Sequence, residues 1–170
     1  LYRDLTCRLD DEPSDTQRKR FHCIVYPVKS SYPSPELYTT GDVMGVLANT
    51  ERKNPNAKVV QDAIRHNANK LMAAESLREV LLAGPGPNFF VPEGSRSNYI
   101  VITPHGDVVT PPAKRILVGV TLSTVKLICQ EKGINFKEAE LTLPQLLDSS
   151  TCVSLAMTGT SVGVLPIRSL

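Results

Sequence analysis

One polar loop, Glu93-Gly94-Ser95-Arg96-Ser97-Asn98, leads directly into the strand-like run 98–103. The loop carries one carboxylate, one glycine and several hydroxyl, amide and guanidinium groups, so it is dense in hydrogen-bonding groups. The run after it is joined to residues 108–110 through Pro104-His105-Gly106-Asp107, a turn sequence typical of a β-hairpin. The loop is therefore either an ordinary polar turn before a strand or part of a ligand site.

Two other loops, residues 117–121 and 159–163, are also rich in glycine, threonine and serine. The first opens a helix. Backbone N–H groups at a helix start, with a hydroxyl beside them, can bind a phosphate group. Each loop alone is also compatible with a turn that binds nothing. Together with the carboxylate loop, they favour an anionic, ring-bearing ligand.

Away from these loops, strand-like and helix-like segments are mixed without strict βαβ order, which predicts a mixed α/β (α+β) fold with helices around a mixed sheet. Residues 29–41 are rich in proline and predict an extended connection. We expect strands at 1–9, 20–28, 78–83, 98–103, 108–110 and 151–157, and helices at 58–75, 121–132 and 142–148.

Two of the expected helices carry clear end signals. Thr121 can N-cap a helix that ends at Gly133, with Leu122, Val125, Ile128 and Cys129 on its buried side. The sequence Thr142-Leu143-Pro144-Gln145 is a capping box with proline at the first helical position.

Composition excludes several function classes. The 170 residues suit one domain, and a net charge of +2 without a basic run gives little reason to expect nucleic-acid binding. No apolar stretch is long enough to span a membrane. The chain's cysteines form no CxxC pair and have no nearby histidine pair, so we expect no metal site and a reducing, cytoplasmic environment. The three histidines have no partner at ligand spacing either.

The ordered motifs resemble those of the class IV aminotransferases, the fold-type IV pyridoxal-phosphate enzymes. This family includes branched-chain and D-amino-acid aminotransferases and aminodeoxychorismate lyases. The resemblance covers about residues 40–167 and rests on the 93–98 loop followed by these segments: Thr110-Pro111-Pro112, Arg115-Ile116-Leu117-Val118-Gly119-Val120-Thr121 and Thr158-Gly159-Thr160-Ser161. It implies a strongly curved mixed sheet closing toward a pseudo-barrel, pyridoxal 5′-phosphate as cofactor, and a homodimer.

Site residues follow from the resemblance position by position. Glu93 matches the carboxylate that pairs with the pyridine nitrogen, which keeps the ring electron-withdrawing. Val120, Thr121 and Thr160 match the phosphate contacts. Ser161 and Val162 match the backbone that faces the substrate carboxylate. Asn98 closes the motif, with an expected structural role.

Two lysines compete for the Schiff base with the cofactor. Lys58 precedes Glu93 by 35 residues and Lys53 precedes it by 40, whereas the family places its lysine a little over thirty residues before that glutamate. The segment from Arg52 to Lys58 also resembles one subgroup's lysine segment. We therefore expect Lys58 to be the catalytic residue, holding the cofactor and acting as the base. Burial near other cations would suit an amine to this task. From residue type alone, both would be solvated surface lysines.

The implied activity is transfer of an amino group between an amino acid and a 2-oxo acid. Two alternatives stay open: a lyase of the aminodeoxychorismate lyase type, and a relative without catalysis. Arg96 could contact the substrate or the surroundings of Glu93, or could lie on the surface. Family members have a smaller N-terminal domain, so we expect residues 1–170 to be the cofactor-binding large domain, without that small domain and the extreme C-terminus.

Overall fold

The computed structural model describes residues 32–170. The strands expected at 1–9 and 20–28 lie outside the described residues, as does the start of the connection expected at 29–41. The elements are α1 (Leu37–Thr40), β1 (Asp42–Leu47), α2 (Asp62–Ala74), β2 (Glu79–Leu82), β3 (Asn98–Ile102), β4 (Val108–Thr110), the 3₁₀ turn η1 (Ala113–Arg115), α3 (Val120–Lys132), β5 (Phe136–Glu138), α4 (Leu143–Leu147), β6 (Ser154–Gly159) and β7 (Gly163–Ser169).

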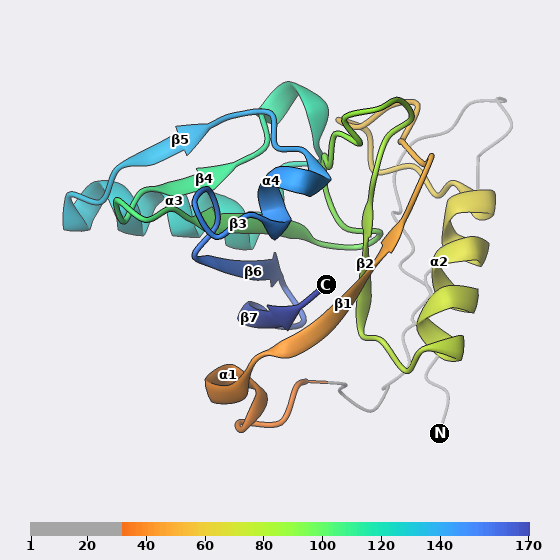
Figure 1. Ribbon diagram of the computed structural model, residues 1–170, viewed down its shortest axis with the longest axis horizontal. Helices are drawn as coiled ribbons and strands as arrows, with labels where there is room; N and C mark the ends of the chain where they lie inside the picture. Colours follow the sequence, from red (N-terminus) through yellow and green to blue (C-terminus); the bar gives the residue numbers. More distant parts are fainter. Residues whose placement is uncertain (1–31) are drawn as a thin grey trace, which may run out of the picture. The chain divides into compact units, whose positions relative to one another are not determined.

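The strands form one seven-stranded mixed sheet in the order β2-β1-β7-β6-β3-β4-β5. Neighbours β3 and β4, β3 and β6, and β6 and β7 run antiparallel, whereas β1 runs parallel to both β2 and β7, and β4 runs parallel to β5. The sheet changes direction between β7 and β1, where the register shifts; β1 and β2 cross the direction of β6 and β7 in Figure 1. The mixed α/β fold class expected from the sequence is confirmed.

Alternation along β3 separates the two faces of the sheet, because successive strand side chains point in opposite directions. Ile100 packs with Leu122 and Cys129 of α3, so α3 covers one face. Tyr99 and Val101 belong to the larger cluster on the other face, with Leu146 of α4 among its members.

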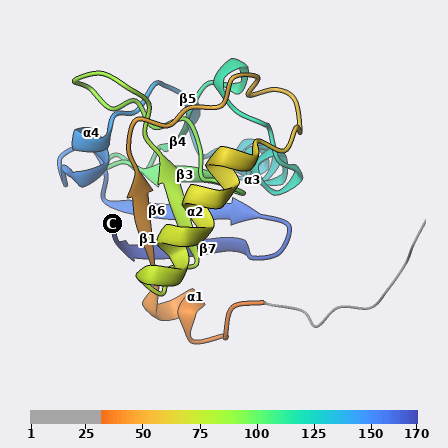
Figure 2. The same ribbon diagram turned by 90° about the vertical axis from the view of Figure 1, so that its right-hand side faces the viewer.

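The helix α2 covers the other end of the sheet. Its buried residues Ala68 and Met72 pack against Val80 of β2. Figure 2 shows α2 lying across β1 and β2. The segment between β1 and α2 and the loop between β2 and β3 are thereby anchored at the same end of the molecule.

Several predicted helix boundaries are wrong. The helix expected at 58–75 begins at Asp62, because Val59 and Val60 are 53% and 63% exposed and have no packing surface to join. Residues 37–40, expected to be extended, form α1.

Two predicted helix ends also need correction, although the C-terminal signal of α3 is confirmed. The N-cap of α3 is Gly119, not Thr121, because the Gly119 carbonyl accepts the first helical hydrogen bond from Ser123. Gly133 ends the helix at a φ of 67°, as expected. Ile128 is 49% exposed and lies off the buried face.

The capping box of α4 is confirmed, with Thr142 as N-cap and Gln145 completing it. Pro144 occupies the second helical position, one later than expected, because the helix begins at Leu143.

The strand expected at 151–157 is shifted to 154–159, and β1, β5 and β7 are additional strands. β7 contains Pro166, which pairs in register with Ala156. Proline usually argues against a strand because it lacks an N–H group, so this strand gave a weak sequence signal.

Candidate functional site

A cavity of about 220 Å³ lies where the loop before β3, the start of α3 and the β6–β7 turn meet. It collects Lys58, Glu93, Val120, Thr121 and Thr160, five of the residues expected from the sequence to hold a cofactor. The described structure also places these residues around it: Arg52, Arg96, Ser97, Asn98, Leu117, Val118, Gly119, Thr158 and Gly159.

The two residues expected to face the substrate lie just beyond the lining of this cavity. Ser161 is exposed on the turn between β6 and β7. The Val162 side chain is buried, and its carbonyl accepts a 2.8 Å hydrogen bond from the Tyr38 hydroxyl. Their backbone groups thus stand at the rim rather than in the cavity wall.

Glu93 is the buried acid of the cavity, with only 3% of the residue exposed. One carboxylate oxygen, Oε2, accepts a 3.1 Å hydrogen bond from the Leu117 N–H and lies 3.5 Å from Asn98 Nδ2. The other, Oε1, accepts no hydrogen bond from a described residue, although the guanidinium of Arg52 lies 2.9 Å away. A carboxylate oxygen without a hydrogen bond has room for one more donor.

Burial raises the pKa of Glu93 from 4.5 to about 7. The Leu117 N–H and the charge of Arg52 oppose this rise, whereas the charge of Glu79 adds to it. A carboxyl group with a pKa of about 7 can carry a proton at neutral pH and exchange it with a bound base.

Arg52 is a residue of the site that sequence reasoning missed. Its Nε pairs with Glu93, and its NH2 group donates a 2.7 Å hydrogen bond to the Ser95 carbonyl. It therefore joins the segment that carries Lys58 to the 93–98 loop. No local sequence signal marks it, because an arginine in a turn-rich segment is normally a solvated residue.

Asn98 links the carboxylate loop to the start of α3. Its Oδ1 accepts a 3.0 Å hydrogen bond from the Gly119 N–H, and its Nδ2 donates a 2.9 Å hydrogen bond to the Leu117 carbonyl. A Cβ on Gly119 would lie 2.6 Å from Asn98 Oδ1, so the close approach requires glycine. These hydrogen bonds support the structural role expected for Asn98.

The first turn of α3 faces the cavity with its N–H groups available. The N–H groups of residues 120–122 precede the first helical hydrogen bond, which runs from Ser123 to Gly119, and so have no helical partner. The Thr121 side chain is half-buried beside them. Free N–H groups at the positive end of a helix dipole suit a phosphate group.

The structure separates the two candidate lysines. Lys58 lines the cavity that contains Glu93, whereas Lys53 lies away from it, beside Asn49 and Asn67. Both side chains are exposed. The burial that would suit Lys58 to the role of a base is therefore not provided by the described residues.

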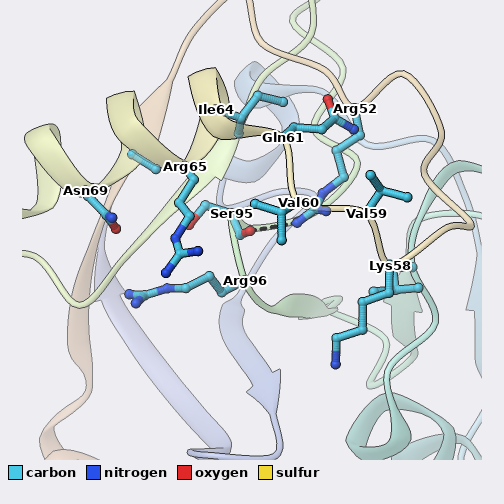
Figure 3. Close-up of a pocket in the computed structure, with 12 residues that line it drawn as sticks. Arg52, Lys58, Val59, Val60, Gln61, Ile64, Arg65, Asn69, Ser95 and Arg96 are labelled. Atoms are coloured by element: carbon cyan, nitrogen blue, oxygen red, sulfur yellow. Dashed lines mark hydrogen bonds between the residues drawn. The ribbon is translucent and has the colours of Figure 1, made fainter. Parts of the chain in front are cut away.

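A second cavity, of about 320 Å³, adjoins the first and shares Arg52, Lys58 and Arg96 with it. Figure 3 shows Arg65 and Arg96 reaching into this space and the Lys58 side chain directed away from them. The guanidinium of Arg96 donates a 2.9 Å hydrogen bond to the Arg78 carbonyl and lies 3.2 Å from Met72 Sδ. Of the alternatives for Arg96, the surface position fits this geometry, because the residue is exposed and its guanidinium contacts Met72 and Arg78 rather than Glu93.

Within residues 32–170, no three histidine, cysteine or acidic side chains cluster as metal ligands would. His66 and His105 are exposed, and His22 lies outside the described residues. None of the helices in this part of the chain is both long and apolar enough to cross a membrane.

The fold and the cavity define the class of protein. A mixed sheet that presents a buried glutamate, a lysine and a helix N-terminus to one cavity has the arrangement of a fold-type IV pyridoxal-phosphate enzyme. The chain belongs to the class IV aminotransferase family: the family model described as amino-transferase class IV matches residues 4–170. This family uses pyridoxal phosphate.

Solved structures share the fold of this chain. A Thermotoga maritima protein provisionally named a branched-chain amino acid aminotransferase has 27% identity and a TM-score of 0.66, over 81% of this chain and 49% of its own. A Mycobacterium tuberculosis protein named a hypothetical aminotransferase, in its form with bound pyridoxal phosphate, has 18% identity and a TM-score of 0.65, over 76% and 48%. A fold IV-transaminase from Curtobacterium pusillum has 22% identity and a TM-score of 0.66, over 78% and 47%.

The chain thus spans about half the length of the solved structures it matches. A search of curated proteins finds no match.

The residues of the cavity fit the family's cofactor. A carboxylate oxygen can accept more than one hydrogen bond, so Glu93 Oε1, which has only its ion pair with Arg52, suits a protonated ring nitrogen, and the open N–H groups of α3 suit a phosphate group. Lys58 adds a primary amine to the same cavity. These groups are chemically complementary to the three ends of pyridoxal phosphate.

Proposed function

We propose that this chain is the cofactor-binding domain of a pyridoxal-phosphate-dependent aminotransferase that moves an amino group between an amino acid and a 2-oxo acid. One observation carries the proposal: Lys58, Glu93, the start of α3 and Thr160 line a single cavity, although they are far apart in the sequence. The family assignment and the structural neighbours support it.

Lys58 is the proposed catalytic residue. Its Nζ would bind the aldehyde carbon of the cofactor until the substrate amine displaces it. The freed Lys58 amine would then move a proton at the substrate α-carbon. The position of Lys53 away from the cavity favours Lys58 for this role. Because Lys58 is exposed, we expect the rest of the enzyme to exclude water from it.

Glu93 would hold a proton at the ring nitrogen. When bound, pyridoxal phosphate supplies an aldehyde that accepts the amino group and a ring that stabilises negative charge at the substrate α-carbon. Arg52 and Asn98 keep the Glu93 carboxylate in place from two sides.

The phosphate group would lie at the start of α3. The N–H groups of Val120 and Thr121 and the Thr121 hydroxyl are its proposed donors, with Thr160 on the opposite turn. Backbone groups of Ser161 and Val162, at the rim, would face the substrate carboxylate.

Residues 1–170 would form the large domain of a longer enzyme whose smaller domain completes the substrate pocket. We further infer that the enzyme is a homodimer in the cytoplasm, as the family resemblance implies. Light scattering of the full-length protein tests the homodimer. A molar mass that corresponds to a monomer would contradict it.

A half-reaction tests the proposed activity. Full-length protein loaded with pyridoxal phosphate is mixed with one amino acid and no keto acid. An aminotransferase forms one equivalent of keto acid per site and the same amount of aminated cofactor, then stops. Continuous formation of pyruvate without an acceptor would identify a lyase instead. Formation of neither product across a panel of L- and D-amino acids would contradict the proposed aminotransferase activity.

A further inference from the structure

Glu79 is a second buried carboxylate, and it lies outside the lining of the cofactor cavity. Only 2% of the residue is exposed, at the start of β2, whose other residues Val80–Leu82 are apolar and buried. Burying a carboxylate costs free energy unless its oxygens are fully hydrogen-bonded. An acid at this position of an apolar strand therefore needs an explanation.

Both oxygens of Glu79 are fully engaged. Oε1 accepts hydrogen bonds from the Val80 N–H at 2.9 Å and the Ser95 hydroxyl at 2.5 Å. Oε2 accepts from the Ser97 hydroxyl at 2.9 Å and the Arg96 N–H at 3.1 Å. No ion pair joins Glu79 to a cation within the described part of the chain. Three of the four donors come from the loop that follows Glu93.

The backbone holds the same loop against β2. The Leu82 N–H donates to the Glu93 carbonyl at 2.9 Å, and the Ser95 N–H donates to the Val80 carbonyl at 2.9 Å. Between them the loop turns tightly: a Cβ at Gly94 would collide with Ser97 Oγ and lie 3.3 Å from the Glu79 carboxyl carbon. The loop that follows Glu93 is thus wrapped around the Glu79 carboxylate.

Arg52 completes the arrangement from the other side. Its NH2 group donates to the Ser95 carbonyl, and Figure 3 shows this contact beside the second cavity. Ser95 is therefore held through its hydroxyl by Glu79 and through its carbonyl by Arg52.

We propose that Glu79 is a positioning residue, which acts through Ser95, Arg96 and Ser97 to aim the Glu93 carboxylate at the ring of the cofactor. This inference rests on the proposed function for its cofactor part. An apolar residue could fill this position of β2 without burying a charge. A carboxylate is explained here because it accepts hydrogen bonds from three donors of the same loop.

The test compares Glu79→Gln with the wild-type full-length protein. In Glu79→Gln, an NH2 group replaces one of the two carboxylate oxygens, each of which accepts two hydrogen bonds. If it replaces Oε2, the amide N–H groups face the Arg96 N–H, which can only donate, so this hydrogen bond is lost. Without cofactor, we expect faster amide hydrogen exchange at residues 93–97 and unchanged exchange in β6. With cofactor, we expect the dissociation constant for pyridoxal phosphate to rise about tenfold, the scale of one lost hydrogen bond to a charged group.

A double-mutant cycle with Glu93→Gln separates positioning from general destabilisation. If Glu79 acts through Glu93, Glu79→Gln has little further effect on affinity in the Glu93→Gln background. The visible absorption band of the bound cofactor should also shift in Glu79→Gln toward its position in Glu93→Gln, which a loss of stability alone would not cause.

Two more variants keep the test decisive. Ser97→Ala retains the carboxylate and removes one donor, so it addresses the proposal if Glu79→Gln fails to fold, with an expected loss of affinity of about threefold. Glu138→Gln changes a glutamate that is 38% exposed and should leave affinity and exchange at 93–97 unchanged.

Additive effects in the cycle, or unchanged hydrogen exchange at residues 93–97, would overturn the proposal for Glu79. Failure of the wild-type protein to bind pyridoxal phosphate would overturn the proposed function instead, while the exchange measurement still decides whether Glu79 holds the loop.

Discussion

The 93–98 loop and the segment 49–61 line the same cavity, but the protein holds them differently. The loop is buried except for Arg96, and its side chains bond to Glu79 and to the start of α3. The segment 49–61 forms neither helix nor strand, and Lys58, Val59 and Val60 are exposed. Arg52 is its strongest link to the loop.

This difference separates two tasks within one site. The groups that would orient the cofactor are fixed by the core of this domain. The amine that would react with it stands on an exposed segment, where few contacts hold it in place. Changes in the segment should therefore affect chemistry, whereas changes in the loop should affect both binding and stability.

Removal of the Lys58 amine should have the largest effect. Lys58→Ala in the full-length enzyme should lower the turnover rate about 10³-fold, because both covalent attachment and proton transfer are lost. Folding should change little, since the side chain is exposed. The control Lys53→Ala should keep the wild-type rate; equal losses in the two variants would contradict the assignment.

The buried loop should respond to pH. Because the pKa of Glu93 is raised from 4.5 to about 7, the folded protein binds more protons than the unfolded chain in this window, and its stability falls as pH rises through it. Glu93→Gln removes this dependence, so the variant should gain up to about 3 kcal/mol relative to the wild type between pH 4.5 and 7. Urea unfolding without cofactor at several pH values measures this; a difference that stays constant with pH argues against it.

The link between loop and helix should tolerate no added methyl group. Gly119→Ala places a Cβ against Asn98 Oδ1, at 2.6 Å in the present geometry, and should cost about 2 kcal/mol of stability as well as cofactor affinity. Thermal unfolding and a cofactor titration measure the two effects. Gly84→Ala is the matched control, since its Cβ would have no contact closer than 3.4 Å. If both variants behave alike, the close approach at Gly119 does not matter.

The smallest effect is expected at the exposed side of the lysine segment. Glu51 forms a 2.7 Å ion pair with Arg115, and both side chains are about a third exposed, at 35% and 36%. Glu51→Gln should therefore change the free energy of unfolding by less than about 1 kcal/mol. A loss of several kcal/mol in denaturant unfolding would show that this segment is held as firmly as the loop.

Much of the fold follows from local signals in the sequence. The hairpin at 98–110, the end of α3 at Gly133 and the capping box at Thr142 were predicted because each depends on neighbouring residues. The strand β7 was missed because Pro166 argues against a strand, and only pairing with β6 and β1 explains it.

In the candidate site, too, some residues could be predicted from the sequence and others could not. The motif residues Glu93, Val120 and Thr160 were selected through a family resemblance, and the structure places them around one cavity. Their roles stay predictions. Arg52 had no signal, since its pairing with Glu93 depends on how distant segments pack. Glu79 has such a signal: it is the one acid in the strand expected at 78–83, directly before the apolar residues 80–83, and its burial requires donors from elsewhere in the chain.

The most direct test of the central claim is to map where pyridoxal phosphate attaches. Full-length protein is incubated with the cofactor, reduced with borohydride, digested and analysed by mass spectrometry. The account predicts the pyridoxyl group on Lys58 and none on Lys53. A label on Lys53 would mean that the lysine segment is wrongly aligned, and no labelled lysine would contradict the proposal that this cavity holds the cofactor of an aminotransferase.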